Sequence, residues 1–221
     1  QPDRIGRTMN ELAHNFQTAQ EEFWASDFGE GYVSRNQGDA LFAANLNYFV
    51  RSLRTAGKFT SAIEFGANIG MNSLALKTLC PGISLKAIEI NALAAVALAG
   101  VIGEENITLG SILDYSSEET FELSFTKGVL IHINPEHLPI VYEKLYDASS
   151  RYILIGEYYN PTPMRISYRG HSDRLFKRDF AGEMLEKYVD LQLIDYGFCY
   201  RGDAVYPQDD LTWFLLEKMR S

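Results

Sequence analysis

The residues best suited to chemistry lie where an apolar run meets a glycine-bearing turn, at residues 63–72 (IEFGANIGMN). Glycines at Gly66 and Gly70 let the backbone turn sharply and approach a ligand closely, because glycine has no Cβ. A dinucleotide site would need further glycines to seat a pyrophosphate on a helix N-terminus. The two positions where these glycines would stand hold Asn68 and Met71 instead. The turn therefore favours a ligand without phosphates and disfavours an NAD-linked oxidoreductase.

Two further apolar runs end in residues that suit a nucleoside. Glu89 lies 23 positions after Gly66, near the interval of about 20 residues at which a Rossmann fold places an acid against ribose hydroxyls. Ser111 and Ile112 follow the next run, where an adenine ring would lie. S-adenosylmethionine (SAM) fits this combination, and Glu64 is expected at its amino-acid end. The predicted cofactor residues in these turns are Glu64, Gly66, Asn68, Gly70, Asn72, Glu89, Ile90, Ser111 and Ile112.

Short apolar runs and helical patterns alternate from about residue 61, which is typical of an α/β fold with a mostly parallel sheet. We expect strands at 62–65, 85–90, 107–109, 123–125 and 152–156, and helices at 71–79, 93–101 and 135–148. A long polar loop is expected after Tyr159, as far as about residue 177, and a helix follows at 179–188. Runs at 191–199 and 211–216 predict a terminal antiparallel strand pair. This order predicts the Rossmann-like fold of SAM-dependent methyltransferases, with a seven-stranded sheet.

The first part of the chain differs from this pattern. Helical spacing at 9–24 and 40–56, separated by a glycine-bearing turn, predicts an N-terminal helical lead-in or cap at residues 1–58. Residues 59–221 would form the Rossmann-like domain, and the two parts one structural unit.

Five segments carry a resemblance to a known family: FWASDFGEGYVSRN, IEFGANIGMN, KGVLIHINPEHLP, GEYYNPTP and YRGHSDRLFKRDFAGEM. Over most of its length the chain resembles the pseudaminic acid biosynthesis-associated methylases. The resemblance implies a SAM-dependent methyltransferase that acts on an acidic sugar or sugar nucleotide in surface-glycan synthesis. It also implies that Tyr32, Arg35 and Asn36 close over the methionine end of SAM, with Arg35 holding the carboxylate.

The segment after the fifth expected strand differs in charge from the rest of the chain. Five basic residues stand against one acid between positions 158 and 178, in a protein of net charge −9. Arginine forks match carboxylates and phosphates, so we expect an anionic acceptor here; a solvated loop paired with the acidic body is the alternative. The predicted acceptor-binding residues are Tyr158, Tyr159, Tyr168, Arg169, Arg174, Lys177 and Arg178.

A hydroxyl acceptor must lose a proton during methyl transfer, and a positioned base helps. His132, Glu157 and His171 are the candidates. His132 follows the fourth expected strand, where a histidine can also simply cap the turn. An amine acceptor would need less help, and no carboxylate cluster predicts a metal site.

The composition limits the possible partners. A net charge of −9 disfavours nucleic acid, which requires a basic surface. No apolar run is long enough for a transmembrane helix, and no signal peptide is evident, so we expect a cytoplasmic enzyme with a small-molecule substrate. A homodimer stays open alongside a monomer. A methyltransferase for another small anionic metabolite and an inactive SAM-binding protein remain alternatives.

Overall fold

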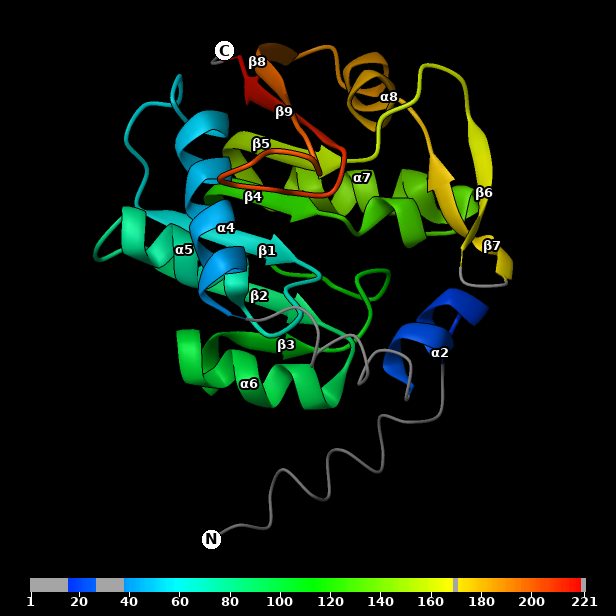
Figure 1. Ribbon diagram of the computed structural model, residues 1–221. Helices are drawn as coiled ribbons and strands as arrows, with labels where there is room; N and C mark the ends of the chain where they lie inside the picture. The colour runs from blue at the N-terminus through cyan, green and yellow to red at the C-terminus, as the bar shows by residue number, and fades with distance from the viewer. Residues whose placement is uncertain (1–15, 27–37, 169–170, 220–221) are drawn as a thin grey trace, which may run out of the picture.

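The computed structural model describes residues 16–26, 38–168 and 171–219. Its centre is a seven-stranded sheet in the order β3-β2-β1-β4-β5-β9-β8 (Figure 1). The strands span Ser61–Phe65 (β1), Ser84–Glu89 (β2), Ile107–Leu109 (β3), Phe121–Lys127 (β4), Ser149–Glu157 (β5), Leu191–Cys199 (β8) and Leu211–Lys218 (β9). β9 runs antiparallel to both β5 and β8, and the other neighbours are parallel. The sheet therefore confirms the predicted mostly parallel order with its terminal antiparallel pair.

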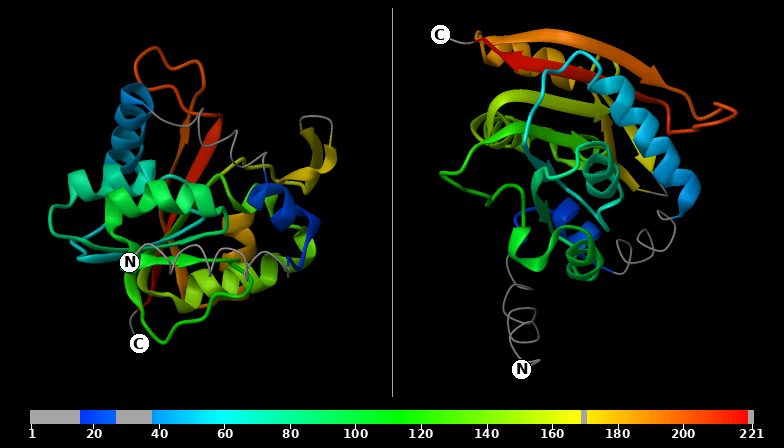
Figure 2. Two further views of the ribbon diagram at one scale, coloured as in Figure 1. Left: turned by 90° about the horizontal axis from the view of Figure 1, so that it is seen from below. Right: turned by 90° about the vertical axis from the view of Figure 1, so that its left-hand side faces the viewer.

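Helices cover both faces of this sheet (Figure 2). α4 (Asp39–Ser52), α5 (Met71–Leu79) and α6 (Ala92–Ile102) pack on one face, and α7 (Leu138–Asp147) and α8 (Phe180–Lys187) pack on the other. Central strands are therefore buried on both sides: four of the five residues of β1 are buried. Burial on both faces explains the uninterrupted apolar run Tyr152–Ile155 of β5, whereas β1 and β4 also bury polar side chains, namely Glu64, Ser124 and Thr126.

Local sequence signals explain where several helices begin. The side chain of Asn91 accepts a hydrogen bond from the backbone N–H of Ala94 at the start of α6. Asp179 does the same for Gly182 at the start of α8. Such caps satisfy backbone donors that have no partner within the helix.

The expected polar loop was wrong, because this segment forms an antiparallel hairpin of β6 (Met164–Tyr168) and β7 (His171–Lys177). Leu175 and Phe176 are buried, whereas residues 161–165 are exposed. The buried residues Leu175 and Phe176 are adjacent in β7, so the strand lacks the regular alternation that marks a strand in a sequence, and the pairing of β6 with β7 defines the ribbon instead. The helix expected at 135–148 divides into a 3-10 turn, Pro135–His137, and α7.

The described part of the N-terminal lead-in has helices in two different places: α4 packs on a face of the sheet, and a shorter helix lies against the turns that follow β2 and β3. α2 (Ala19–Ala25) begins with a capping box formed by Thr18 and Glu21. Of the helix expected at 9–24, residues 16–18 precede the helix, because Thr18 caps it, and residues 9–15 lie outside the described residues, as does the glycine-bearing turn. α4 contributes Tyr48 and Phe49 to the core. No helix among the described residues is long and apolar enough to span a membrane.

Candidate functional site

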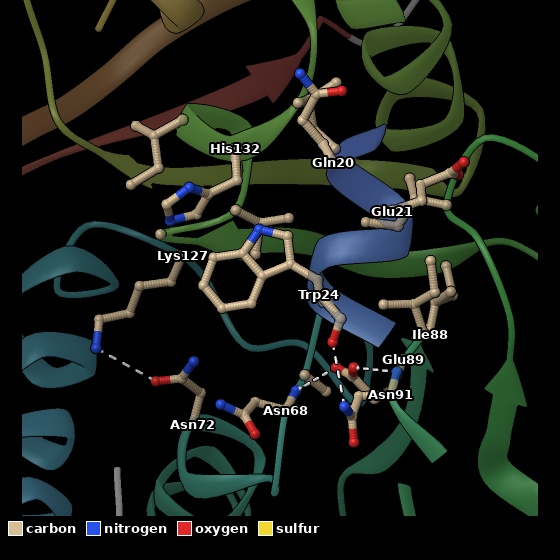
Figure 3. A pocket seen from close by; sticks show the side chains of 18 of the residues that line it. Gln20, Glu21, Trp24, Asn68, Asn72, Ile88, Glu89, Asn91, Lys127 and His132 are labelled. Atoms are coloured by element: carbon tan, nitrogen blue, oxygen red, sulfur yellow. Dashed lines mark hydrogen bonds between the residues drawn. The ribbon is translucent and has the colours of Figure 1, made fainter. Parts of the chain in front are cut away.

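A cavity of about 560 Å³ opens at the carboxyl ends of the parallel strands. This is the edge at which open α/β sheets bind ligands. Much of its described lining comes from the turns after β1, β2, β3 and β4 and from α2 (Figure 3). Further lining residues come from α4, from Tyr158 after β5, from β7, and from β9 with the segment before it. Nine predicted residues line it, namely Gly66, Asn68, Asn72, Glu89, Ile90, Ser111, Ile112, His132 and Tyr158.

The turn after β1 keeps the cavity wall close to the backbone. Gly66 and Gly70 have φ angles of +78° and +85°, and Asn68 has a φ of 49°. This left-handed region strongly favours glycine and tolerates asparagine. A Cβ at Gly66 would lie 2.6 Å from Cγ2 of Val129. Gly70 does not line the cavity; it caps α5 in the left-handed conformation.

Glu89 presents a buried carboxylate at the end of β2. Its oxygens accept hydrogen bonds from the backbone N–H groups of Asn68 (2.6 Å) and Asn91 (2.7 Å). Burial raises the pKa of Glu89, and these backbone hydrogen bonds oppose the shift. Each carboxylate oxygen can accept a second hydrogen bond, which suits the paired hydroxyls of a ribose.

Ser111 and Ile112 line the cavity beyond Glu89. The Ser111 hydroxyl donates to the carboxylate of Glu21 on α2, and it accepts from the backbone N–H of Leu113. α2 is also held by the Asn91 side chain, which donates to the backbone oxygen of Trp24 (3.1 Å). The lead-in helix thus closes over the end of the cavity that suits adenine.

A polar cluster forms the opposite end of the cavity. Nζ of Lys127 donates to Oδ1 of Asn45 (2.7 Å) and of Asn72 (3.4 Å). Asn72 and Ser73 in turn donate to the Glu64 carboxylate, at 2.9 and 2.6 Å. Burial raises the pKa of Glu64 to about 7 and lowers that of Lys127 to about 8. Glu64 is not among the cavity-lining residues; it orients Asn72, which is.

His132 ends the 3-10 turn Leu130–His132 after β4 and lines the cavity. Its ring centroid lies 4.6 Å from that of Trp24. The Glu157 carboxylate accepts hydrogen bonds from the backbone N–H groups of residues 129–131, at 3.0 to 3.4 Å. Burial raises the pKa of Glu157 to about 7. Glu157 is absent from the described lining of the cavity, so its geometry favours positioning the His132 turn over the predicted role as a base.

The predicted acceptor residues divide between the cavity and its surroundings. Tyr158 lines the cavity, and Nζ of Lys177 lies 5.3 Å from its ring centroid. Arg178 instead donates to the carboxylate of Glu183 at 2.7 Å. Tyr159 is 40% exposed and packs against Phe214, 5.8 Å between ring centroids. The described lining therefore does not include Lys177, Arg178 or Tyr159.

Some predicted residues cannot be placed in this cavity. Tyr32, Arg35, Asn36 and Arg169 lie outside the described residues. The side chains of Tyr168, His171 and Arg174 do so as well.

Several cavity residues were not predicted from the sequence. Glu21 and Trp24 come from α2, Asn45 from α4, and Gln208 from the segment before β9. Nothing local marks them, because they reach the cavity only through the packing of distant segments. Lys127 is different, since a lysine that ends the buried strand FELSFTK is itself a signal.

Charged side chains are few among the described lining residues. The acids are Glu21, Glu89 and Asp209, and Lys127 is the one lysine or arginine. Among the described residues, no three or more histidine, cysteine, aspartate or glutamate side chains form a group that could hold a metal ion.

No protein-family model matches the sequence, and no curated protein matches it either. Solved structures do match. The 1,6-didemethyltoxoflavin-N1-methyltransferase of Burkholderia thailandensis, solved with 1,6-didemethyltoxoflavin and S-adenosylhomocysteine (SAH), superposes with a TM-score of 0.70 over 93% of each chain, at 15% identity. The chain has the fold of SAM-dependent methyltransferases.

Two further methyltransferase structures support this assignment of the fold. The plantazolicin methyltransferase BpumL, solved with SAH, gives a TM-score of 0.60 at 13% identity, over 98% of this chain and 99% of that one. A SAM-dependent methyltransferase of Clostridium acetobutylicum ATCC 824 gives 0.60 at 10% identity, over 87% and 98%.

Proposed function

We propose that this protein is a SAM-dependent methyltransferase that methylates a small acidic sugar or sugar nucleotide. The cavity carries this proposal, because its glycine turn, the Glu89 carboxylate and Ile112 all belong to one lining. Similar folds solved with SAH support the same cofactor. Adenine would lie at Ser111 and Ile112, the ribose hydroxyls at Glu89, and the methionine part along the turn at Gly66.

Methyl transfer is a displacement at the sulfonium carbon. The acceptor atom forms a bond to the methyl group while the bond to sulfur breaks, and SAH leaves without the sulfonium charge. The protein's main task is alignment within attack distance. His132 lines this cavity and would take the proton from a hydroxyl acceptor. An amine acceptor would depend on His132 less.

The identity of the acceptor rests on the family resemblance and on charge. The resemblance to pseudaminic acid biosynthesis-associated methylases points to an acidic nonulosonic sugar or its CMP-activated form. Five basic residues at positions 158–178 are consistent with an anion, and Tyr158 provides an aromatic surface in the cavity. A cytoplasmic location and a possible homodimer complete the proposal.

Calorimetric titration with SAH tests the cofactor site first. The comparison uses the wild type, Glu89→Ala, and Glu136→Ala, which removes an exposed carboxylate. We expect micromolar binding that Glu89→Ala weakens at least tenfold, or about 1.4 kcal/mol, whereas Glu136→Ala changes it less than twofold. Absence of SAH binding to the wild type would overturn the methyltransferase proposal.

Transfer of a labelled methyl group from SAM tests the acceptor. The panel pairs N-acetylneuraminic acid and its CMP-activated form, as nonulosonic acids, with neutral N-acetylhexosamines. Label on an acidic sugar alone supports the proposal, and His132→Gln should then lower turnover about 10²- to 10⁴-fold while SAH affinity stays within threefold. SAH binding without transfer to any sugar would favour another anionic metabolite or an inactive SAM-binding protein.

A further inference from the structure

Lys127 carries a positive charge into the cavity between α4 and α5. Its Nζ atom donates to Oδ1 of Asn45 at 2.7 Å and to Oδ1 of Asn72 at 3.4 Å. The ring of Tyr48 lies 5.0 Å from the same atom. Both hydrogen-bond acceptors are therefore neutral amide oxygens, held on two different helices.

The charge of Lys127 is not neutralised within the described part of the chain. No ion pair joins it to a described carboxylate, although Glu64, Asp209 and Glu157 lie close enough to raise its pKa and so oppose the effect of burial. Lys127 is half-buried, and a lysine withdrawn from water is seldom left without a partner of opposite charge. A cation that lines a cavity and contacts only neutral groups is a suitable position for the anionic group of a ligand.

The position of Lys127 along the cavity indicates which anionic group this is. Under the proposed function, Glu89 marks the ribose and Ser111 the adenine. Asn72 and Lys127 lie on the other side of the cavity from Ile88 and Glu89 (Figure 3). In SAM the amino-acid group is the end farthest from adenine, so its carboxylate would reach this cluster.

We propose that Lys127 binds the amino-acid carboxylate of SAM, while Asn45 and Asn72 hold the ammonium group of Lys127 in place. This inference rests on the proposed function and adds a residue that neither the glycine turn nor the acid at the ribose position predicts. Arg35, to which the family resemblance gave this role, lies outside the described residues.

Two ligands that differ only at the amino-acid end test the inference. SAH carries this group, and 5′-methylthioadenosine has the same adenine, ribose and thioether without it. Both are titrated into the wild type, Lys127→Met, and Lys58→Met, which removes an exposed lysine. The methionine side chain keeps much of the lysine's length without its charge, and Asn45 still accepts a hydrogen bond from Gln208 at 3.0 Å.

We expect Lys127→Met to weaken SAH binding at least tenfold and to change 5′-methylthioadenosine binding less than twofold. Lys58→Met should change neither by more than twofold, and Lys127→Arg should keep most of the preference for SAH. Unchanged SAH binding in Lys127→Met, or an equal loss for both ligands, would overturn the role of Lys127. Failure of both ligands to bind the wild type would overturn the proposed cofactor site, and this inference with it.

Discussion

Replacing Gly66 by alanine tests the geometry of the turn that borders the cavity. The position has a φ of +78°, where an L-residue costs about 1–2 kcal/mol relative to glycine. The new Cβ would also lie 2.6 Å from Cγ2 and 3.0 Å from Cγ1 of Val129, and overpacking of this kind costs about 1–3 kcal/mol. We therefore expect Gly66→Ala to lower the free energy of unfolding by about 2–5 kcal/mol.

Urea denaturation of four variants separates the two contributions. Gly82 has a similar φ of +85° with nothing within 4 Å of its Cβ position, so Gly82→Ala measures the backbone cost alone. Val129→Ala removes the methyl groups that the new Cβ would meet. The double variant Gly66→Ala/Val129→Ala should be more stable than the sum of the single effects predicts, by about 1–3 kcal/mol. Additive effects, or a Gly66→Ala loss no larger than that of Gly82→Ala, would refute the reasoning.

Three further changes test other parts of the molecule. The buried Tyr48 hydroxyl has no hydrogen-bond partner among the described residues, and a Cβ at Gly156 would collide with it. Tyr48→Phe should therefore raise the free energy of unfolding by about 1 kcal/mol in chemical denaturation. The same change should reduce the cost of Gly156→Ala. Burial raises the pKa of Glu64 from 4.5 to about 7 in the folded protein. The stability that the folded protein has below the unfolded-state pKa is therefore lost as the pH rises through the folded-state pKa. Between pH 4.5 and 7, Glu64→Gln should gain on the order of 3 kcal/mol relative to wild type, and a constant difference would contradict this. Asp179→Ala removes the cap of α8 and should cost about 1 kcal/mol in thermal unfolding, with SAH affinity unchanged.

Elements with a strong local pattern were predicted closely from the sequence. The helix at Met71–Leu79 and the strands at Ile107–Leu109 and Leu191–Cys199 have the expected bounds. Their apolar runs and flanking turn residues are properties of short segments. The hairpin of β6 and β7 was missed for the opposite reason, since the pairing between the two strands defines it and neither strand has a strong pattern of its own.

The sequence by itself determined the order of the elements and the chemistry of the turn at Gly66. Apolar periodicity and turn residues act over a few positions, and the topology of parallel strands then brings Glu89 and Ser111 to the same edge. Only the tertiary structure decided which other side chains complete the cavity. Trp24, Asn45 and Lys127 meet there from three distant segments, and Glu157 is turned toward backbone N–H groups. Those outcomes depend on how layers pack across long sequence separations, and no local pattern encodes that packing.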